Sequence, residues 1–366
     1  MNSRELMCAA MRRQPTERIP TMPQICHDTP VHIFAEEDGR DWIDGMRRCI
    51  EEPAAIYDYV IRLVRLVGAD GVRLFVKPEP MKTQRMRDEV YAFDAETGER
   101  LGRIDLLGGG GLIPDRPEPP IETIEDAKKR LEAMVQGYSD EKIAILREAR
   151  QRVPDLFVAS SPIGITMNTY AILRGRVQGM LDFYDRPQFV EHVMQLQAEA
   201  AIRAGEKLLS AGIDCFYIGD PSSSGSLISP QHFERFCLPA YQTFCRHFRH
   251  SDILIYIHIC GNSRIILEMM ADSGAHVVEP LDPLGGVSVA DAKQRIGHKV
   301  GLMGGVNTLT LWMGTPDEVR AEAIQKCREG GPYGYILAAG DMVPPETPLA
   351  NLQALVDVAT KSLWKE

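Results

Sequence analysis

A buried β-strand is predicted for Ile253-Leu254-Ile255-Tyr256-Ile257-His258-Ile259-Cys260, an apolar run that ends in two reactive side chains and is followed at once by Gly261-Asn262. Side chains alternate faces along a strand, so His258 and Cys260 would project side by side. Imidazole and thiolate are typical zinc ligands. A zinc site needs at least one more protein ligand, and a histidine at a strand end is often only structural. The pattern slightly favours a metal site over that simpler interpretation.

Short β-rich runs alternate with amphipathic helical stretches on both sides of this segment, which is typical of parallel βαβ units. The predicted strands are Ile19–Ile25, Gly71–Val76, Leu156–Ser160, Ile213–Gly219, Ile253–Cys260, His276–Pro280, Lys299–Gly304 and Tyr335–Ala339. The clearest predicted helices are Gln188–Ser210, Pro230–Arg249, Ser263–Ser273 and Pro316–Glu329. Eight such units favour a closed α/β fold, the (β/α)8 TIM barrel, over an open doubly wound sheet. We expect one domain that spans residues 1–366.

One region departs from this alternation. Residues Val90–Ile104 have the pattern of a β-hairpin with its turn at Glu96–Gly98. A loop rich in glycine and proline, Gly108–Pro120, follows it. We interpret residues 88–120 as an insertion after the second strand, a flap with a flexible hinge. A phosphate-binding loop is the weaker alternative, because no GKS/T motif follows the glycines.

The composition is that of an ordinary globular enzyme. The 366 residues are 44% hydrophobic and 25% charged, with a formal net charge of −10. This charge argues against a nucleic-acid or anionic-membrane partner. No apolar run is long enough to cross a membrane, and residues 1–6 do not resemble a signal peptide. Eight cysteines without a CxxC pair indicate reduced thiols, so we expect a cytoplasmic protein.

Function in a barrel collects at the carboxyl ends of the strands. Polar residues at or after the predicted ends, besides His258 and Cys260, are Cys26, His27, Tyr170, Asp220, Ser222, Glu279, Asp282, Asn307 and Asp341. A set this rich in ligand and acid–base groups is what catalysis requires. Each has a simpler alternative: Asp220 could cap a turn, and Glu279 and Asp282 could be ordinary loop carboxylates. Cys26 and His27 are adjacent and would face opposite ways, so we expect at most one of them in the site.

Several segments together resemble the uroporphyrinogen decarboxylase superfamily. They are residues 11–20, the Asp220-Pro221-Ser222 segment with its sequel, His258-Ile259-Cys260-Gly261-Asn262, Leu302-Met303-Gly304-Gly305-Val306 and Pro344-Pro345-Glu346-Thr347-Pro348. The resemblance runs in order along nearly the whole chain, and it implies a single (β/α)8 barrel.

Two motifs of the true decarboxylases are replaced in this chain, and these replacements indicate which branch of the superfamily it resembles. True decarboxylases carry an arginine-rich motif after the first strand, but residues 24–29, at that place in this chain, contain no arginine. True decarboxylases also carry an aspartate at the end of the second strand, but residues 75–79, at that place here, contain no aspartate. Zinc-dependent methyltransferases that work with corrinoid proteins instead hold zinc with a His-x-Cys pair and a later Cys. The pair matches His258 and Cys260, and the later position is Asp341. A carboxylate can bind zinc, so His258, Cys260 and Asp341 are the predicted metal ligands.

The resemblance therefore implies a zinc-dependent methyltransferase that moves a methyl group between a small O-, S- or N-methyl compound and a corrinoid protein or a pterin or thiol acceptor. It implies a catalytic role for Asp220, Glu279 and Tyr170, and substrate binding by Ser222, Cys26, His27 and Asn307. A carboxylate at position 341 makes the site less thiophilic, which argues against a thiol substrate more than against the metal. Two alternatives stay open: a cofactor-free uroporphyrinogen decarboxylase, and a non-catalytic corrinoid- or tetrapyrrole-binding protein. A monomer or homodimer is compatible with the family.

Overall fold

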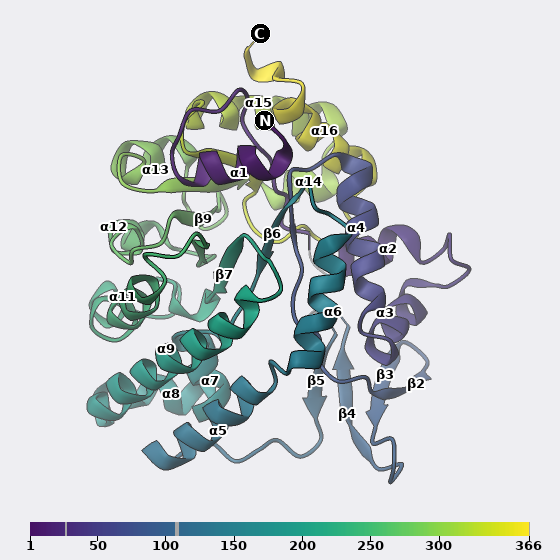
Figure 1. The fold of residues 1–366 in the computed structure, drawn as a ribbon, viewed down its shortest axis with the longest axis vertical. Coiled ribbons are helices and arrows are strands. Elements are labelled where there is room, and N and C mark those ends of the chain that lie inside the picture. Colours follow the sequence, from purple (N-terminus) through teal and green to yellow (C-terminus); the bar gives the residue numbers. More distant parts are fainter. Residues whose placement is uncertain (26–27, 107–109, 366) are drawn as a thin grey trace.

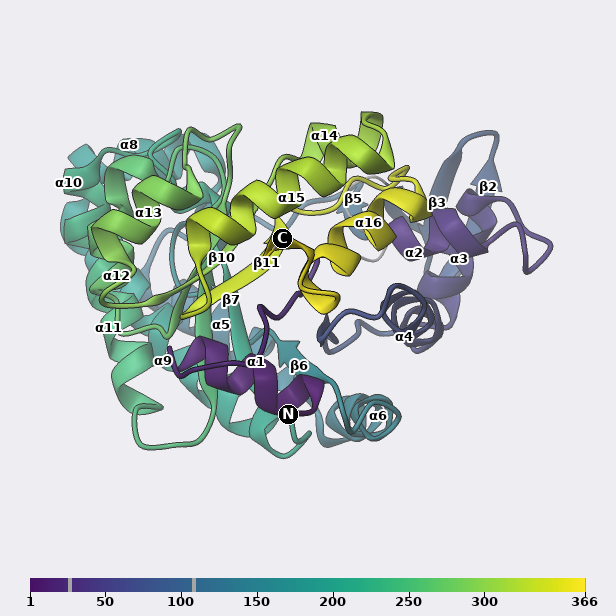
Figure 2. The same ribbon diagram turned by 90° about the horizontal axis from the view of Figure 1, so that it is seen from above.

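A curled parallel β-sheet forms the centre of the molecule, with helices packed around its outside (Figures 1 and 2). The computed structural model describes residues 1–25, 28–106 and 110–365. In these residues the sheet has seven strands in the order β1-β6-β7-β8-β9-β10-β11. Their bounds are Gly71–Arg73, Phe157–Ser160, Cys215–Gly219, Leu254–His258, Val277–Leu281, Gly301–Val306 and Tyr335–Ala339. Each lies within a predicted strand or within two residues of one.

The register of the strands brings polar positions to one end of the sheet. His258 on β8 pairs with Gly219 on β7 and with Glu279 on β9. One layer below, the inner face is apolar and buried, with side chains that include Phe157, Ala159, Cys215, Leu254, Tyr256, Met303, Ile336 and Ala338. An apolar interior with polar groups only at the carboxyl ends of the strands is the arrangement that positions a site in α/β folds.

The prediction of an eighth strand at residues 19–25 is wrong for the described residues, which hold only one isolated bridge there, Thr21 to Leu337. Pro20 and Pro23 explain the difference, because proline has no N–H to donate to a strand ladder. The segment nevertheless lies between the two edge strands. Its backbone bonds Leu337 twice, through Pro20 O and Met22 N, and Thr21 O accepts from the N–H of Asp70 just before β1.

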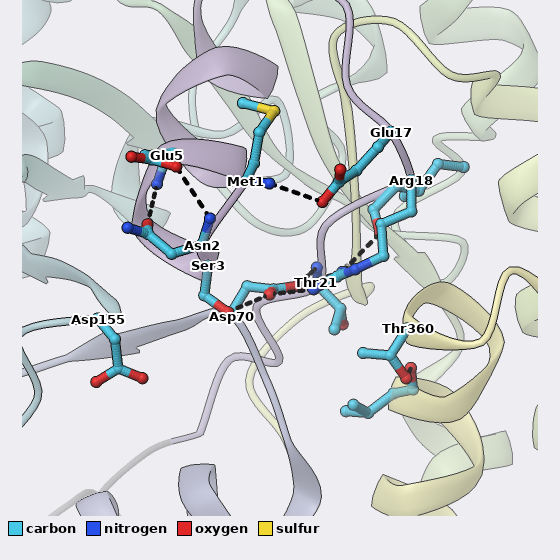
Figure 3. A network of polar contacts seen from close by, with 12 residues as sticks. Met1, Asn2, Ser3, Glu5, Glu17, Arg18, Thr21, Asp70, Asp155 and Thr360 are labelled. Atoms are coloured by element: carbon cyan, nitrogen blue, oxygen red, sulfur yellow. Dashed lines mark hydrogen bonds and ion pairs between the residues drawn. The ribbon is translucent and has the colours of Figure 1, made fainter.

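Asp70 fixes this segment to the start of β1 (Figure 3). Its carboxylate is fully buried and accepts from Ser3 Oγ at 2.6 Å, from the backbone N–H of Thr21 at 3.0 Å, and from both terminal nitrogens of Arg18 at 2.6 and 2.8 Å. Such a two-pronged arginine contact is geometrically specific as well as strong. One side chain thus connects the N-terminal helix, the extended segment and the sheet.

Replacing Asp70 with alanine should lower the free energy of unfolding by about 3–5 kcal/mol, because it leaves Arg18 without its buried partner. Chemical denaturation of the two proteins would measure this. Glu17→Ala is the matched control, since the Glu17 side chain is exposed and its carboxylate accepts from the N-terminal amine. The control should change stability by less than about 1 kcal/mol. A similar small effect for Asp70→Ala would contradict its proposed structural role.

Helices connect the strands and cover the outer face of the sheet (Figure 2). Those before β6 are α1 (Ser3–Met11), α2 (Asp28–Phe34), α3 (Trp42–Glu51), α4 (Ala55–Val67), α5 (Ile124–Gln136) and α6 (Asp140–Gln151). Those after β6 are α7 (Met167–Arg174), α8 (Arg176–Asp185), α9 (Pro187–Leu209), α10 (Pro230–His232), α11 (Leu238–His247), α12 (Leu267–Ala271), α13 (Val289–Ile296), α14 (Thr308–Met313), α15 (Pro316–Gly330) and α16 (Leu349–Thr360). Two of the four clearest predicted helices are the continuous α9 and α15. The predicted helix 230–249 is divided by a short π-helical turn, Phe233–Cys237, which joins α10 to α11, and the predicted helix 263–273 is a 3-10 turn, Arg264–Ile266, followed by α12.

A second, antiparallel sheet lies beside α3, away from the parallel sheet (Figures 1 and 2). Its four strands, in sheet order, are β2 (Lys82–Met86), β3 (Glu89–Phe93), β4 (Arg100–Asp105) and β5 (Gly111–Pro114). The predicted hairpin segment forms β3 and β4. The expected flexible loop is partly wrong, since Gly111–Pro114 pairs with β4 as an edge strand. Residues 107–109, within or next to the predicted glycine hinge, lie outside the described part of the chain.

No helix in the described part of the chain combines the length and the apolar character that a membrane crossing requires.

Candidate metal centre

Three potential metal ligands meet at the carboxyl end of the parallel sheet. His258 is the last residue of β8, Cys260 lies in the turn after it, and Asp341 follows β11. One imidazole nitrogen, the thiol sulfur and one carboxylate oxygen all lie within 4.8 Å of one another. His258 Nε2 lies 3.6 Å from Asp341 Oδ1. The structure thus brings together the three residues predicted as metal ligands, two of them from one strand end and one from 81 positions further along the chain.

Glu279 orients the imidazole of His258. Its Oε2 lies 2.6 Å from His258 Nδ1, and both side chains are buried. This contact leaves Nε2 to face Asp341. Burial by itself lowers the pKa of His258, but the Glu279 carboxylate, Tyr217 and the contact with Cys260 outweigh it, so that the pKa lies well above its usual range. A carboxylate on the second nitrogen is the arrangement that fixes the tautomer and ring orientation of metal-binding histidines.

A second carboxylate lies near Asp341. Asp282 follows β9, accepts from the backbone N–H of Leu284 at 2.8 Å and is largely buried. Burial raises its pKa, and the charge of Asp341 raises it further. Asp341 itself is partly exposed and accepts from the N–H of Met342 at 2.7 Å. Asp341 therefore places a carboxylate 3.6 Å from His258 Nε2, and Asp282 lies within electrostatic reach of Asp341, an acidic setting that a bound cation would relieve.

Asp220, predicted as a catalytic acid or base, is engaged in a buried network. Its carboxylate accepts from the hydroxyl of Tyr241 at 2.8 Å, from the backbone N–H of Asn168 at 2.8 Å, and from the hydroxyl of Thr166. Burial raises its pKa, although these donors pull in the other direction. The contacts join the loop after β6 to the loop after β7, which favours a positioning role over proton transfer.

Replacing Asp220 with asparagine tests these two roles. The new side-chain amide nitrogen at position 220 would face groups that are themselves hydrogen-bond donors. We therefore expect the free energy of unfolding to fall by about 1–3 kcal/mol, and the activity to fall with it. Denaturation curves and pH–rate profiles would measure both quantities. A proton-transfer role predicts the opposite pattern: unchanged stability, lost activity and loss of one limb of the profile.

The other predicted site residues have distinct surroundings. The Tyr170 hydroxyl donates to buried Asp182 at 2.8 Å, and Asp182 is paired with Arg174. Ser222 Oγ donates to the side-chain oxygen of Asn168 at 3.2 Å. The side chain of Asn307 accepts from Leu309 N and so caps α14.

Cys26 and His27 lie outside the described residues. Substrate contact by any of these five residues stays a prediction.

Three further residues near His258 were missed by sequence reasoning: Gln24, Arg73 and Tyr217. The ring of Tyr217 lies 5.6 Å from the imidazole of His258, and the guanidinium of Arg73 lies 5.0 Å from the centre of the Tyr217 ring. Arg73 donates to Gln24 Oε1 at 3.2 Å. For two of them the sequence held a signal: Gln24 lies two residues beyond the inward Met22, and Tyr217 lies two residues beyond the inward Cys215.

Comparison with known proteins places this fold and site in a family. Residues 103–362 match the family Uroporphyrinogen decarboxylase (URO-D). Because the match covers well over half of the chain, this protein belongs to the URO-D family.

Its relatives include two kinds of enzyme. The methylcobamide:CoM methyltransferase MtaA of Methanosarcina barkeri is 35% identical over 167 residues, which cover 45% of this chain and 47% of that protein. The chain thus matches about half the length of that relative. The methylcobamide:CoM methyltransferase MtbA of Methanosarcina acetivorans is 25% identical over 97% of both chains. The uroporphyrinogen decarboxylase of Nostoc punctiforme is 28% identical over 90% of this chain and 88% of that protein.

A solved structure described as a methyltransferase from Methanosarcina mazei has the same fold. It superposes with a TM-score of 0.69 at 21% identity and covers 99% of both chains. At this identity the likeness supports the fold alone.

Proposed function

We propose that this protein is a zinc-dependent methyltransferase that moves a methyl group between a small O-, S- or N-methyl compound and a corrinoid protein or a pterin or thiol acceptor. The observation that carries the proposal is the cluster of one imidazole, one thiol and one carboxylate at the carboxyl end of the sheet. Full-length relatives named as methylcobamide methyltransferases support the reaction class. We also propose that residues 1–366 form one domain in which segment 19–25 takes the eighth place of a closed (β/α)8 barrel.

The three side chains fit zinc in their chemistry. Zinc accepts nitrogen, sulfur and oxygen ligands at about 2.0–2.3 Å, and catalytic sites keep three protein ligands and one open position. His258 offers Nε2, because Nδ1 is held by Glu279. Asp341 is partly exposed, so a substrate can approach from its side. When bound, zinc would act as a Lewis acid that lowers the pKa of a thiol or hydroxyl at the open position.

The remaining residues would hold the reactants and keep the cluster in shape. Glu279 holds the imidazole by its buried 2.6 Å contact. Asp220 holds the first turn of α7 through the N–H of Asn168, whose side chain accepts from Ser222. If the reaction runs from methylcobalamin to a thiol, the thiolate takes the methyl group as the cobalt–carbon bond breaks, and the bonding electron pair stays on cobalt as cob(I)alamin.

The direct test combines metal analysis with a methyl-transfer assay. Purified protein should contain about one zinc per chain. With free methylcobalamin as donor and a small thiol as acceptor, cob(I)alamin should appear spectroscopically under anaerobic conditions, and the reverse reaction should consume it when an O-, S- or N-methyl compound is supplied. Folded protein that binds no zinc would overturn the proposal. Conversion of uroporphyrinogen to coproporphyrinogen by metal-free protein would favour the decarboxylase alternative instead.

A further inference from the structure

A short turn after β9 contacts both of the loops that carry metal ligands. It covers residues 282–285, directly after the end of β9, and we call it the β9 turn. The carbonyl oxygen of Asp282 accepts from the N–H of Gly285 at 3.1 Å and from the N–H of Val287 at 2.9 Å. The turn is thus closed by its own backbone, and it is compact enough to support the loops beside it.

The first of these contacts is with the turn that carries Cys260. A Cβ atom at position 285 would lie 2.1 Å from the carbonyl oxygen of Gly261, so the two backbones meet with no room for a side chain. Burial raises the pKa of Asp282, but backbone N–H groups that donate to its carboxylate lower it. These N–H groups belong to Leu284, Gly285 and Gly261. The Asp282 carboxylate therefore connects the β9 turn to the residue next to Cys260.

The second contact is with the loop that carries Asp341. A Cβ atom at position 340 would lie 2.6 Å from Pro283 Cδ and 3.4 Å from the Cα of Asp282. Pro283 thus lies directly against the backbone of Gly340, which precedes Asp341 in the sequence. The β9 turn therefore packs against the immediate neighbours of two metal ligands that come from distant parts of the chain.

The loop after β7 also holds the turn that carries Cys260. Gly225 N donates to Asn262 O at 3.1 Å, and Asn262 N donates to Ser226 Oγ at 3.0 Å. Gly261 itself has φ +76°, a left-handed conformation that glycine adopts at little cost. Two neighbouring loops thus fix this turn, so a change in the β9 turn should displace Cys260 without unfolding the sheet.

We infer that Asp282 is a positioning residue, which holds Cys260 and Asp341 at the spacing at which both can bind one metal ion. The inference rests on the proposed function, because it assumes a metal on these ligands. His258 lies on a strand and is oriented by Glu279, whereas Cys260 and Asp341 lie in loops and are partly exposed. Ligands on loops are placed less precisely than ligands on strands unless neighbouring groups fix them. The buried Asp282 carboxylate is such a group.

Zinc affinity, measured by competition with a chromophoric chelator, tests this role in three variants. Asp282→Leu removes every acceptor and should weaken zinc binding by about 10–100-fold, the usual effect of losing an outer hydrogen-bond partner. Asp282→Asn keeps one oxygen that can accept from Gly261 N–H, so it should restore most of the affinity. Gly285→Ala keeps the carboxylate but places a methyl group against Gly261 O, and should weaken zinc binding by about tenfold. Gly285 is not in the left-handed region, so the strain of an alanine there comes from this contact.

Two further measurements separate positioning from stability. With Co²⁺ in place of zinc, the sulfur-to-cobalt charge-transfer band reports how well Cys260 binds the metal. The band should weaken in Asp282→Leu and Gly285→Ala and return in Asp282→Asn. In metal-free protein, alkylation of Cys260 by iodoacetamide, followed by mass spectrometry, should become faster in the same two variants, because a turn that opens locally exposes its thiol.

The matched controls are Asp94→Leu and Gly111→Ala in the second sheet. Asp94 also accepts from backbone N–H groups of a turn, and no atom of the described residues lies within 4 Å of a Cβ at Gly111. Both controls should match wild type in all three measurements, and circular dichroism would check that every variant folds.

Two results would overturn the positioning role of Asp282. One is wild-type metal affinity and Cys260 reactivity in both Asp282→Leu and Gly285→Ala. The other is an Asp282→Asn protein as impaired as Asp282→Leu, because the charge and not the hydrogen bonds would then matter. Failure of the proposed function is read separately: wild-type protein would bind neither zinc nor Co²⁺, while alkylation of Cys260 would still test the contact between the two turns.

Discussion

His258→Ala protein is expected to fold but to retain no stoichiometric zinc. The substitution removes the one nitrogen ligand of the cluster, and Cys260 and Asp341 alone cannot provide the three protein ligands of a catalytic zinc site. Methyl transfer should fall at least about a hundredfold, since a Lewis acid contributes several kcal/mol to such reactions. Zinc content by elemental analysis and cob(I)alamin formation by absorbance would measure the two effects.

The matched control for this variant is His276→Ala. His276 is also partly buried, but it lies at the other end of the strands, where its Nδ1 accepts from the backbone N–H of Ile255. The control should lose some stability and keep its zinc. Full zinc content in His258→Ala would contradict the metal site, and loss of zinc from both variants would show that the effect is one of stability.

The sequence predicted the parallel strands well because each is a short apolar run bounded by polar or turn residues. Ile253–Cys260 and Tyr335–Ala339 are examples, and β8 and β11 lie at those positions. The prediction was wrong at residues 19–25, where an apolar pattern also contains Pro20 and Pro23. Periodicity records which side chains are buried but not which N–H groups are available, so this segment has the position of a strand without its ladder.

The candidate site could be predicted only as far as its strand ends. His258 and Cys260 follow from local alternation, and Asp341 followed from the family resemblance. The role of Asp220 could not be inferred in this way, because its partner Thr166 is 54 residues away in sequence and Tyr241 is 21 residues away. A carboxylate at a strand end looks the same in sequence whether it faces a substrate or a ring of hydroxyl donors.

The hydrogen-bond partner of Tyr170 could not be predicted from the sequence either, although it is close in the chain. Its hydroxyl partner, Asp182, is only 12 residues away, but the pairing depends on how α7 and α8 pack.

Gln24 and Arg73 were missed because their partners are distant in the sequence. Each lies in a mostly apolar extended segment, and their contact appears only when the curled sheet brings Arg73 over Tyr217 and beside Gln24.

Glu279→Gln should weaken zinc binding by about 10–100-fold without unfolding the protein, which is the usual effect of changing the carboxylate behind a metal-binding histidine. The amide can still accept from His258 Nδ1, but it carries no charge to support the imidazole. Competition with a chromophoric chelator would measure the zinc dissociation constant.

A second measurement separates orientation of His258 from general stability. The Glu279 carboxylate favours the protonated imidazole and helps to raise the pKa of His258 in metal-free protein. Removing its charge should therefore lower that pKa, which NMR titration of the imidazole would detect. Glu322→Gln is the control: Glu322 also bonds a strand end, through the N–H of Asn307, but on β10. It should leave both the pKa and the zinc affinity unchanged. If Glu279→Gln behaved like this control, the 2.6 Å contact would hold the two strands together without tuning the metal ligand.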